Sequence, residues 1–257
     1  MLNKQNFMFI CIVFSIYGCT ADRSLVPNLD GDQISVTVKV PEELIAEEMQ
    51  VMYRSKLCTF TDHTASGVPY QRDGYQRTDI QPVRLGQTNV YEAKLPVDGG
   101  GACQWRLSNV TFGVMYKNPT SFGDGVYYGA GGGVVVIFDN NDSGRGGADR
   151  KVEGNLVLKL DYYPWISERY IGGYKKSVNL TGEGSIYVKY QALQARQVYF
   201  EPILHSGFLA HSIGPEKKHE GNQTIFYYPD GSNSPEIQSK PSFRKLQAIR
   251  LAAEAQE

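Results

Sequence analysis

Two pairs of neighbouring residues could carry acyl-transfer chemistry, because a histidine can act as a base toward a serine hydroxyl. His205 precedes Ser206, and His211 precedes Ser212. Side chains of adjacent residues in a strand point to opposite faces, so neither pair is expected to meet. We therefore expect both histidines to be structural, held by hydrogen bonds. A hydrolase with an unrecognised site is kept as an alternative.

Metal and phosphate chemistry have weaker signals. The stretch 139–144 supplies oxygen ligands and a turn, as a calcium loop does, but the twelfth position of that frame is Arg150 rather than glutamate. The glycine-rich stretch 129–133 lacks the Lys and Ser/Thr of a phosphate-binding loop. The stretch 139–144 reads better as a solvated loop, and the stretch 129–133 as a flexible approach to a hairpin. We expect no catalytic residues, no metal and no cofactor, and hence a protein that is not an enzyme.

The charge balance limits the class of partner. The chain has 26 basic and 27 acidic residues, so it lacks the positive field that nucleic-acid binding requires. It is also rich in Tyr (17) and Gly (27), which is typical of a sheet protein with long loops. We expect no nucleic acid as partner.

The N-terminus reads as a signal peptide. Lys4 supplies a positive start, and the apolar run 7–17 is too short to span a bilayer as a helix. The following Gly18-Cys19, preceded by Ile16, resembles the lipobox of bacterial lipoproteins, although Tyr17 is bulkier than the usual residue. This resemblance implies cleavage before Cys19 and acylation of that residue. The alternative is a plain secretory peptide.

The resemblance also implies a location. Asp after the lipidated cysteine tends to retain lipoproteins at the inner membrane, and this chain has Thr20 there. We therefore expect an outer-membrane protein, anchored by lipid, with its body in the periplasm. The predicted organisation is a signal peptide (1–18), a lipidated cysteine with a polar tether (19–32) and a β-rich body (33–257). Two subdomains divided near 140–150 remain an alternative to one domain.

Two cysteines remain once Cys11 leaves with the signal peptide and Cys19 is acylated. An isolated pair in an oxidising compartment is expected to be bonded, so Cys58 and Cys103 are predicted to form a disulfide. A metal site lacks neighbouring ligands at usable spacing, and a catalytic thiol is less favoured because two thiols pair unless geometry forbids it.

Alternating apolar residues and turn signals predict many short strands. We expect strands at 33–40, 50–56, 90–95, 103–116 with a bulge near Ser108-Asn109, 134–138, 156–160, 185–190, 196–201 and 223–228. Helices are expected at 41–45 and 242–253, and loops at 59–77, 117–133 and 139–150. These elements predict an all-β, antiparallel β-sandwich-like body with one or two short helices and one disulfide.

Large aromatic residues beside glycine stand out in the loops. Rigid rings supply contact area at low entropic cost, so these loops are candidate partner-binding surfaces, although the rings could instead fold back over the sheet core. The candidate partner-binding residues are Phe122, Asp124, Tyr127, Tyr128, Asn140, Asn141, Asp142 and Arg145.

Several segments together resemble a known family. They are the anchor at Cys19, the stretches 51–58 and 103–107, the stretch 161–165 and the turn 228–231. They are similar to proteobacterial lipoproteins encoded beside phospholipase effectors of type VI secretion, which are immunity proteins. The resemblance covers nearly the whole mature chain, but no shared motif marks the family's binding residues.

The resemblance implies a function as well as a location. It implies that the chain binds an incoming lipase effector at its active-site face and blocks substrate access, while lipid holds the chain at the membrane. The alternative is a structural or assembly lipoprotein of the envelope that binds another protein or a glycan.

Overall fold

The computed structural model describes residues 22–140, 147–184, 187–217, 221–236 and 239–256. These residues form eighteen strands in two sheets, one short 3-10 helix, η1 (Pro119–Phe122), and one α-helix, α1 (Phe243–Glu254). The all-β class and the two-sheet arrangement predicted from the alternation are confirmed. Within the described ranges, no helix is long and apolar enough to cross a membrane.

The first sheet has ten strands, and its strands far apart in sequence lie side by side. Its spatial order is β18 (Asn233–Glu236), β17 (Thr224–Tyr227), β16 (Ala210–Ile213), β12 (Leu156–Arg169), β15 (Gln197–Leu204), β1 (Gln33–Lys39), β6 (Val90–Pro96) and β5 (Val83–Arg84). Two more strands branch from β12, first β13 (Lys175–Thr181) and then β9 (Val126–Tyr128). Strand β15 runs parallel to both of its neighbours, so antiparallel pairing is not universal.

The second sheet has eight strands. Its order is β11 (Arg150–Lys151), β14 (Tyr187–Gln191), β10 (Gly132–Ile137), β8 (Trp105–Tyr116), β3 (Met49–His63) and β4 (Pro69–Ile80), with β2 (Leu44–Ala46) and β7 (Asp98–Gly100) also pairing with β8. Alternate side chains of the two sheets meet in the main hydrophobic core. There the rings of Phe112 in β8 and Phe200 in β15 pack edge to face, with centroids 5.8 Å apart.

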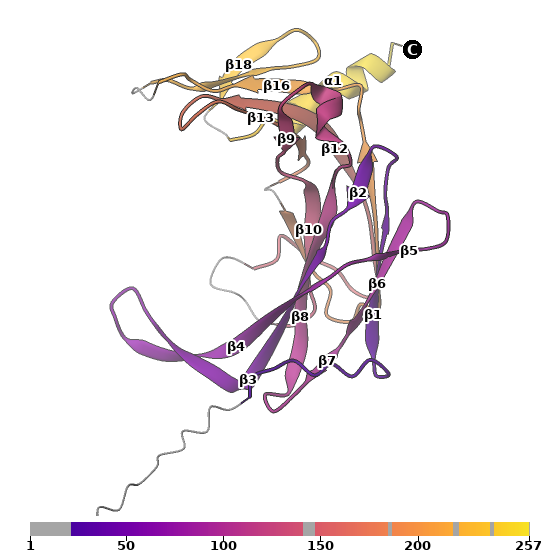
Figure 1. Ribbon diagram of the computed structural model, residues 1–257, viewed down its shortest axis with the longest axis vertical. Coiled ribbons are helices and arrows are strands. Elements are labelled where there is room, and N and C mark those ends of the chain that lie inside the picture. Colours follow the sequence, from indigo (N-terminus) through magenta and orange to yellow (C-terminus); the bar gives the residue numbers. More distant parts are fainter. Residues whose placement is uncertain (1–21, 141–146, 185–186, 218–220, 237–238, 257) are drawn as a thin grey trace, which may run out of the picture.

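Strand β12 belongs to two hydrophobic clusters. Its first half contributes Leu156 and Leu158 to the main core, and its second half contributes Tyr163 and Trp165 to a smaller cluster closed by Leu246 of α1. This second cluster lies at the end of the longest axis that also carries the C-terminus (Figure 1). Residues on both sides of the stretch 140–150 pack in the main core. The change from one cluster to the other occurs later in the chain, within β12.

Local sequence signals predicted several details correctly. In the ladder between β3 and β8, Met52 faces Asn109 and Tyr53 faces Leu107, which leaves Ser108 as the extra residue of a bulge. The side chain of Ser242 accepts a hydrogen bond from Lys245 N and caps α1. The disulfide between Cys58 and Cys103 is present, with Cα atoms 5.4 Å apart.

The largest error concerns the predicted loop at 59–77, which is a hairpin of β3 and β4 that projects from the body as an arm (Figure 1). Both faces of the arm are exposed where it projects beyond the rest of the sheet. Its residues therefore show no alternation of apolar and polar side chains, which is the pattern that predicts a strand. Cross-strand contacts hold it instead: Arg72 lies 2.7 Å from Asp62 and stacks over Phe60.

Two shorter predictions were also wrong. The expected helix at 41–45 is a turn leading into β2, because pairing with the end of β8 outweighs the local helix signal. The expected loop at 117–133 contains η1 and β9 and ends in β10. The parallel pairing of β9 with β13 depends on residues about fifty positions later, so no local pattern announces it.

Candidate functional site

A groove lies on the surface of the first sheet where β12, β13 and β9 run side by side. It has two adjoining depressions of about 340 and 160 Å³, which share Ala130, Trp165, Asn179 and Ser239. The larger depression is also lined by Tyr127, Tyr128, Gly129, Ser167, Arg169 and Ser177. We call the two depressions together the groove. Their combined size is within the range that small ligands and short peptide segments fill.

The floor of the groove follows from strand alternation. Trp165 and Ser167 are two residues apart on β12 and face Asn179 and Ser177 of β13, so the four side chains share one face of the sheet. All four are largely buried. Three of them are small and polar, whereas the same face nearer α1 carries large apolar side chains. The small side chains leave the space that forms the groove.

Asn179 holds the rim of the groove in place. Its Oδ1 accepts a hydrogen bond of 2.8 Å from Ala130 N, and its Nδ2 donates to Trp165 O and Ser177 O at 3.3 and 3.2 Å. A Cβ at Gly129 would lie 1.9 Å from Asn179 Oδ1, so only glycine allows this approach. The glycine-rich stretch thus serves close packing rather than phosphate binding.

Several polar groups at the groove remain available to a ligand. Among the described residues, no hydrogen bond or ion pair engages the side chains of Ser167, Ser239, Tyr127 and Arg169. The hydroxyl of Ser177 accepts from Asn179 Nδ2 and can still donate its own proton. The groove therefore offers hydroxyl donors and one guanidinium beside exposed tyrosine rings, which suits a partly anionic polar ligand.

Lys240 closes the smaller depression. Its Nζ donates to the carbonyl oxygens of Gly182 and Gly184 at 3.2 and 2.5 Å, which ties the segment before α1 to the end of β13. Burial lowers the pKa of the Lys240 amine. We therefore regard Lys240 as a structural part of the groove wall, unlike Arg169.

The predicted partner-binding residues that the structure describes do not form one patch. Tyr127 and Tyr128 line the groove, and Tyr128 is fixed by a hydrogen bond from its hydroxyl to Lys117 O. Phe122 folds back onto Tyr116, with ring centroids 4.8 Å apart, and packs against the main core. Asp124 is exposed in the turn before β9.

Of the four remaining candidates, the structure describes Asn140. Asn140 is exposed beyond the end of β10, on the second sheet. Asn141, Asp142 and Arg145 lie outside the described residues, as does the lipidation candidate Cys19. Their assignments stay predictions.

The two histidines have charged or polar partners. His205 Nε2 lies 2.7 Å from Asp161 Oδ1, and the other oxygen of that carboxylate accepts from Gln247 of α1, so this pair helps to attach the helix. His211 Nε2 lies 3.0 Å from Glu168 Oε1. The neighbouring Ser212 instead accepts a hydrogen bond from the Trp165 indole. Adjacent Ser and His therefore engage different groups, as expected.

Sequence reasoning missed most of the groove. Ser167, Arg169, Ser177 and Asn179 belong to no motif, and their only signal is small polar residues at a spacing of two near Trp165. Where the chain is described, no group of three or more His, Cys, Asp and Glu side chains could hold a metal ion.

Comparisons with known proteins found no match for this chain. No protein-family model matches the sequence, and no curated protein or solved structure matches it either.

Proposed function

We propose that this chain is a lipid-anchored protein of the bacterial outer membrane that binds and inhibits a phospholipase effector of type VI secretion. The proposal combines the lipobox-like segment ending at Cys19 with the resemblance to immunity lipoproteins. On this proposal the protein protects the producing cell by binding, without a catalytic step of its own.

The observation that carries the binding role is the groove. It combines two exposed tyrosine rings, at 38% for Tyr127 and 43% for Tyr128, with the guanidinium of Arg169 and free hydroxyls. Tyr and Arg dominate the energetics of protein interfaces, and a partly enclosed site lets them act together. These features support an exposed acidic or polar loop of the effector as the segment that enters the groove.

The place of the groove in the molecule also supports the proposal. Strands β9 and β13 lie at one end of the longest axis, and the first described residues, from Asp22 onward, lie at the other (Figure 1). A protein anchored through its N-terminus would thus present the groove to an incoming effector rather than to its own membrane. The end of the first sheet around the groove could then cover the active-site face of a partner that binds there.

The decisive experiment is to purify any phospholipase encoded beside this gene and to titrate it with the purified, lipidated chain in detergent. We expect a stoichiometric complex and loss of phospholipase activity. Tyr128→Ala is expected to weaken the complex about ten-fold, as loss of a central interface tyrosine does. Tyr70→Ala on the arm is the matched control, because Tyr70 is 42% exposed. Undiminished lipase activity at equimolar excess would reject the proposal.

A second candidate function is a structural or assembly lipoprotein that binds another envelope protein or a glycan. The observation that favours it is the hydroxyl lining of the groove beside tyrosine rings, which also suits a sugar chain. Binding of purified envelope glycan fragments to the chain, weakened by Tyr128→Ala and accompanied by no effect on the lipase, would favour this function.

A further inference from the structure

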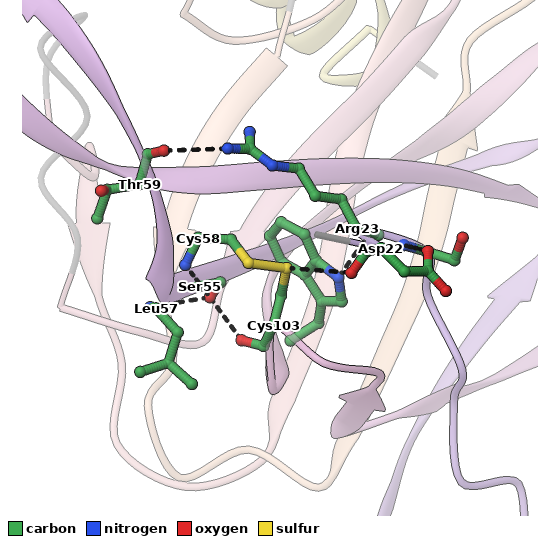
Figure 2. The surroundings of a disulfide bond; sticks show 9 residues. Asp22, Arg23, Ser55, Leu57, Cys58, Thr59 and Cys103 are labelled. Carbon is green, nitrogen blue, oxygen red and sulfur yellow. Dashed lines mark hydrogen bonds between the residues drawn. A yellow bond between two sulfur atoms is a disulfide. The ribbon is translucent and has the colours of Figure 1, made fainter. Parts of the chain in front are cut away.

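The first described residues of the chain are held against the disulfide (Figure 2). The carbonyl oxygen of Arg23 accepts a hydrogen bond of 3.0 Å from Trp105 Nε1. The Arg23 guanidinium donates to Thr59 O at 3.4 Å. The carbonyl oxygen of Asp22 lies 3.8 Å from the sulfur of Cys103. That sulfur carries no hydrogen in a disulfide, so this is a packing contact. The segment predicted as a tether is thus attached to the body from Asp22 onward.

Two glycines form the seat of this segment. Gly100 and Gly101 have φ values of 58° and 69°, and a Cβ on them would lie 2.1 Å from Val26 O and 2.4 Å from Ser24 O. The segment also pairs with this turn through its backbone, since Val26 N donates to Gly99 O at 2.9 Å. The glycine-rich turn is therefore built to receive the N-terminal segment.

This attachment limits the distance to the proposed anchor. Only two residues separate Cys19 from Asp22. Three extended peptide steps span roughly 11 Å, so an acyl group on Cys19 would hold the disulfide end of the body close to the lipid surface.

The same end exposes aliphatic side chains. Val26, Leu29 and Leu57 are 62%, 70% and 63% exposed. Val26 and Leu29 belong to the seated segment, and Leu57 adjoins Cys58. Ser55 Oγ accepts hydrogen bonds from the backbone N–H groups of Leu57 and Cys58, and the Leu57 side chain points away from the disulfide (Figure 2). We call Val26, Leu29 and Leu57 the base.

We infer that the base rests on the interface of the bilayer that holds the lipid of Cys19, so that the molecule stands on its disulfide end. This inference rests on the lipid anchor of the proposed function. The occupant of the base is the membrane surface, because the chain that leads to the anchor ends beside it. Aliphatic side chains at the headgroup boundary add affinity for the bilayer, and the groove then faces away from the membrane.

The test uses the full, lipidated chain in vesicles of phosphatidylethanolamine and phosphatidylglycerol that contain a nitroxide-labelled lipid. Leu57→Cys and Leu209→Cys each receive a fluorescent label. Both leucines are exposed, and Leu209 directly precedes β16, which lies toward the opposite end of the molecule (Figure 1). We expect the nitroxide lipid to quench the label at 57 at least three-fold more strongly than the label at 209. Leu29→Cys should behave like Leu57→Cys.

The outcomes separate this inference from the proposed function. Mass spectrometry of the same preparation reports acylation of Cys19. An acylated protein whose labels are quenched equally would overturn the base while leaving the anchor intact. An unacylated protein would remove both. If the labels at 29 and 57 escape lipid quenching but become shielded when the effector is added, the base binds protein instead and the inference is wrong.

Discussion

The indole nitrogen of Trp105 donates a hydrogen bond of 3.0 Å to the carbonyl oxygen of Arg23, which joins β8 to a segment 82 residues earlier. Trp105 is only 1% exposed, and a buried indole N–H needs an acceptor. The acceptor comes from the N-terminal segment rather than from the sheet. This segment is therefore part of the folded body.

A single methyl group added to the seat of the N-terminal segment should lower the stability of the protein. Gly100→Ala introduces a Cβ against Val26 O at a positive φ, so we expect a loss of unfolding free energy of about 2–3 kcal/mol. Gly86→Ala is the matched control, because Gly86 has a φ of 59° and open space around it. It should cost only about 1 kcal/mol. Urea unfolding measures both, and equal losses would contradict the role of the seat.

The disulfide should contribute strongly to stability. It joins residues 45 apart, and the loop-entropy model gives about 4 kcal/mol for a loop of that length. The variant with Cys58→Ala and Cys103→Ala should therefore show a much lower urea midpoint than the parent protein. Adding reductant should lower the parent's midpoint and leave the variant unchanged. A parent midpoint insensitive to complete reduction would refute this expectation.

The stability of the protein should depend on pH through Glu47. Burial raises the pKa of this carboxyl, which lies against Gly131 and near Tyr162. A carboxyl whose pKa is higher in the folded state destabilises that state when ionised. This penalty shrinks as pH falls below the folded pKa and is gone below the pKa of the unfolded chain. Glu47→Gln should thus raise stability at neutral pH, with a gain that vanishes in acid.

The control for this pH effect is a comparison of the parent protein and Glu47→Gln at a second, acidic pH. If Glu47→Gln gives the same gain at pH 4 as at pH 7, the effect is steric and the ionisation argument fails.

Filling the groove should block the partner without unfolding the protein. The Ser167 side chain points into a depression of about 340 Å³, so Ser167→Phe places a ring where a ligand would sit. We expect at least a ten-fold loss of effector affinity and, because Ser167 is buried, a loss of unfolding free energy of about 1–3 kcal/mol that leaves the protein folded. Calorimetric titration and thermal unfolding measure the two quantities. Retained affinity in a folded variant would place the binding surface elsewhere.

The accuracy of the sequence predictions follows the range of the interactions involved. The bulge at Ser108 and the cap at Ser242 were predictable, because each depends on residues a few positions away. The arm was missed because exposure on both faces removes the apolar alternation that marks a strand. Two of the three aromatic candidates reached the groove, since Tyr127 and Tyr128 line it while Phe122 packs on Tyr116.

By itself the sequence determined the all-β class and the pairing of Cys58 with Cys103, because these depend on residue period and cysteine count. Lipidation at Cys19 stays a prediction from a local motif. Only the tertiary structure decided that Ser167 and Asn179 share a groove and that Arg23 lies on Trp105. Strand partners are chosen by the burial of whole faces, and that choice brings together residues whose separation in sequence carries no signal.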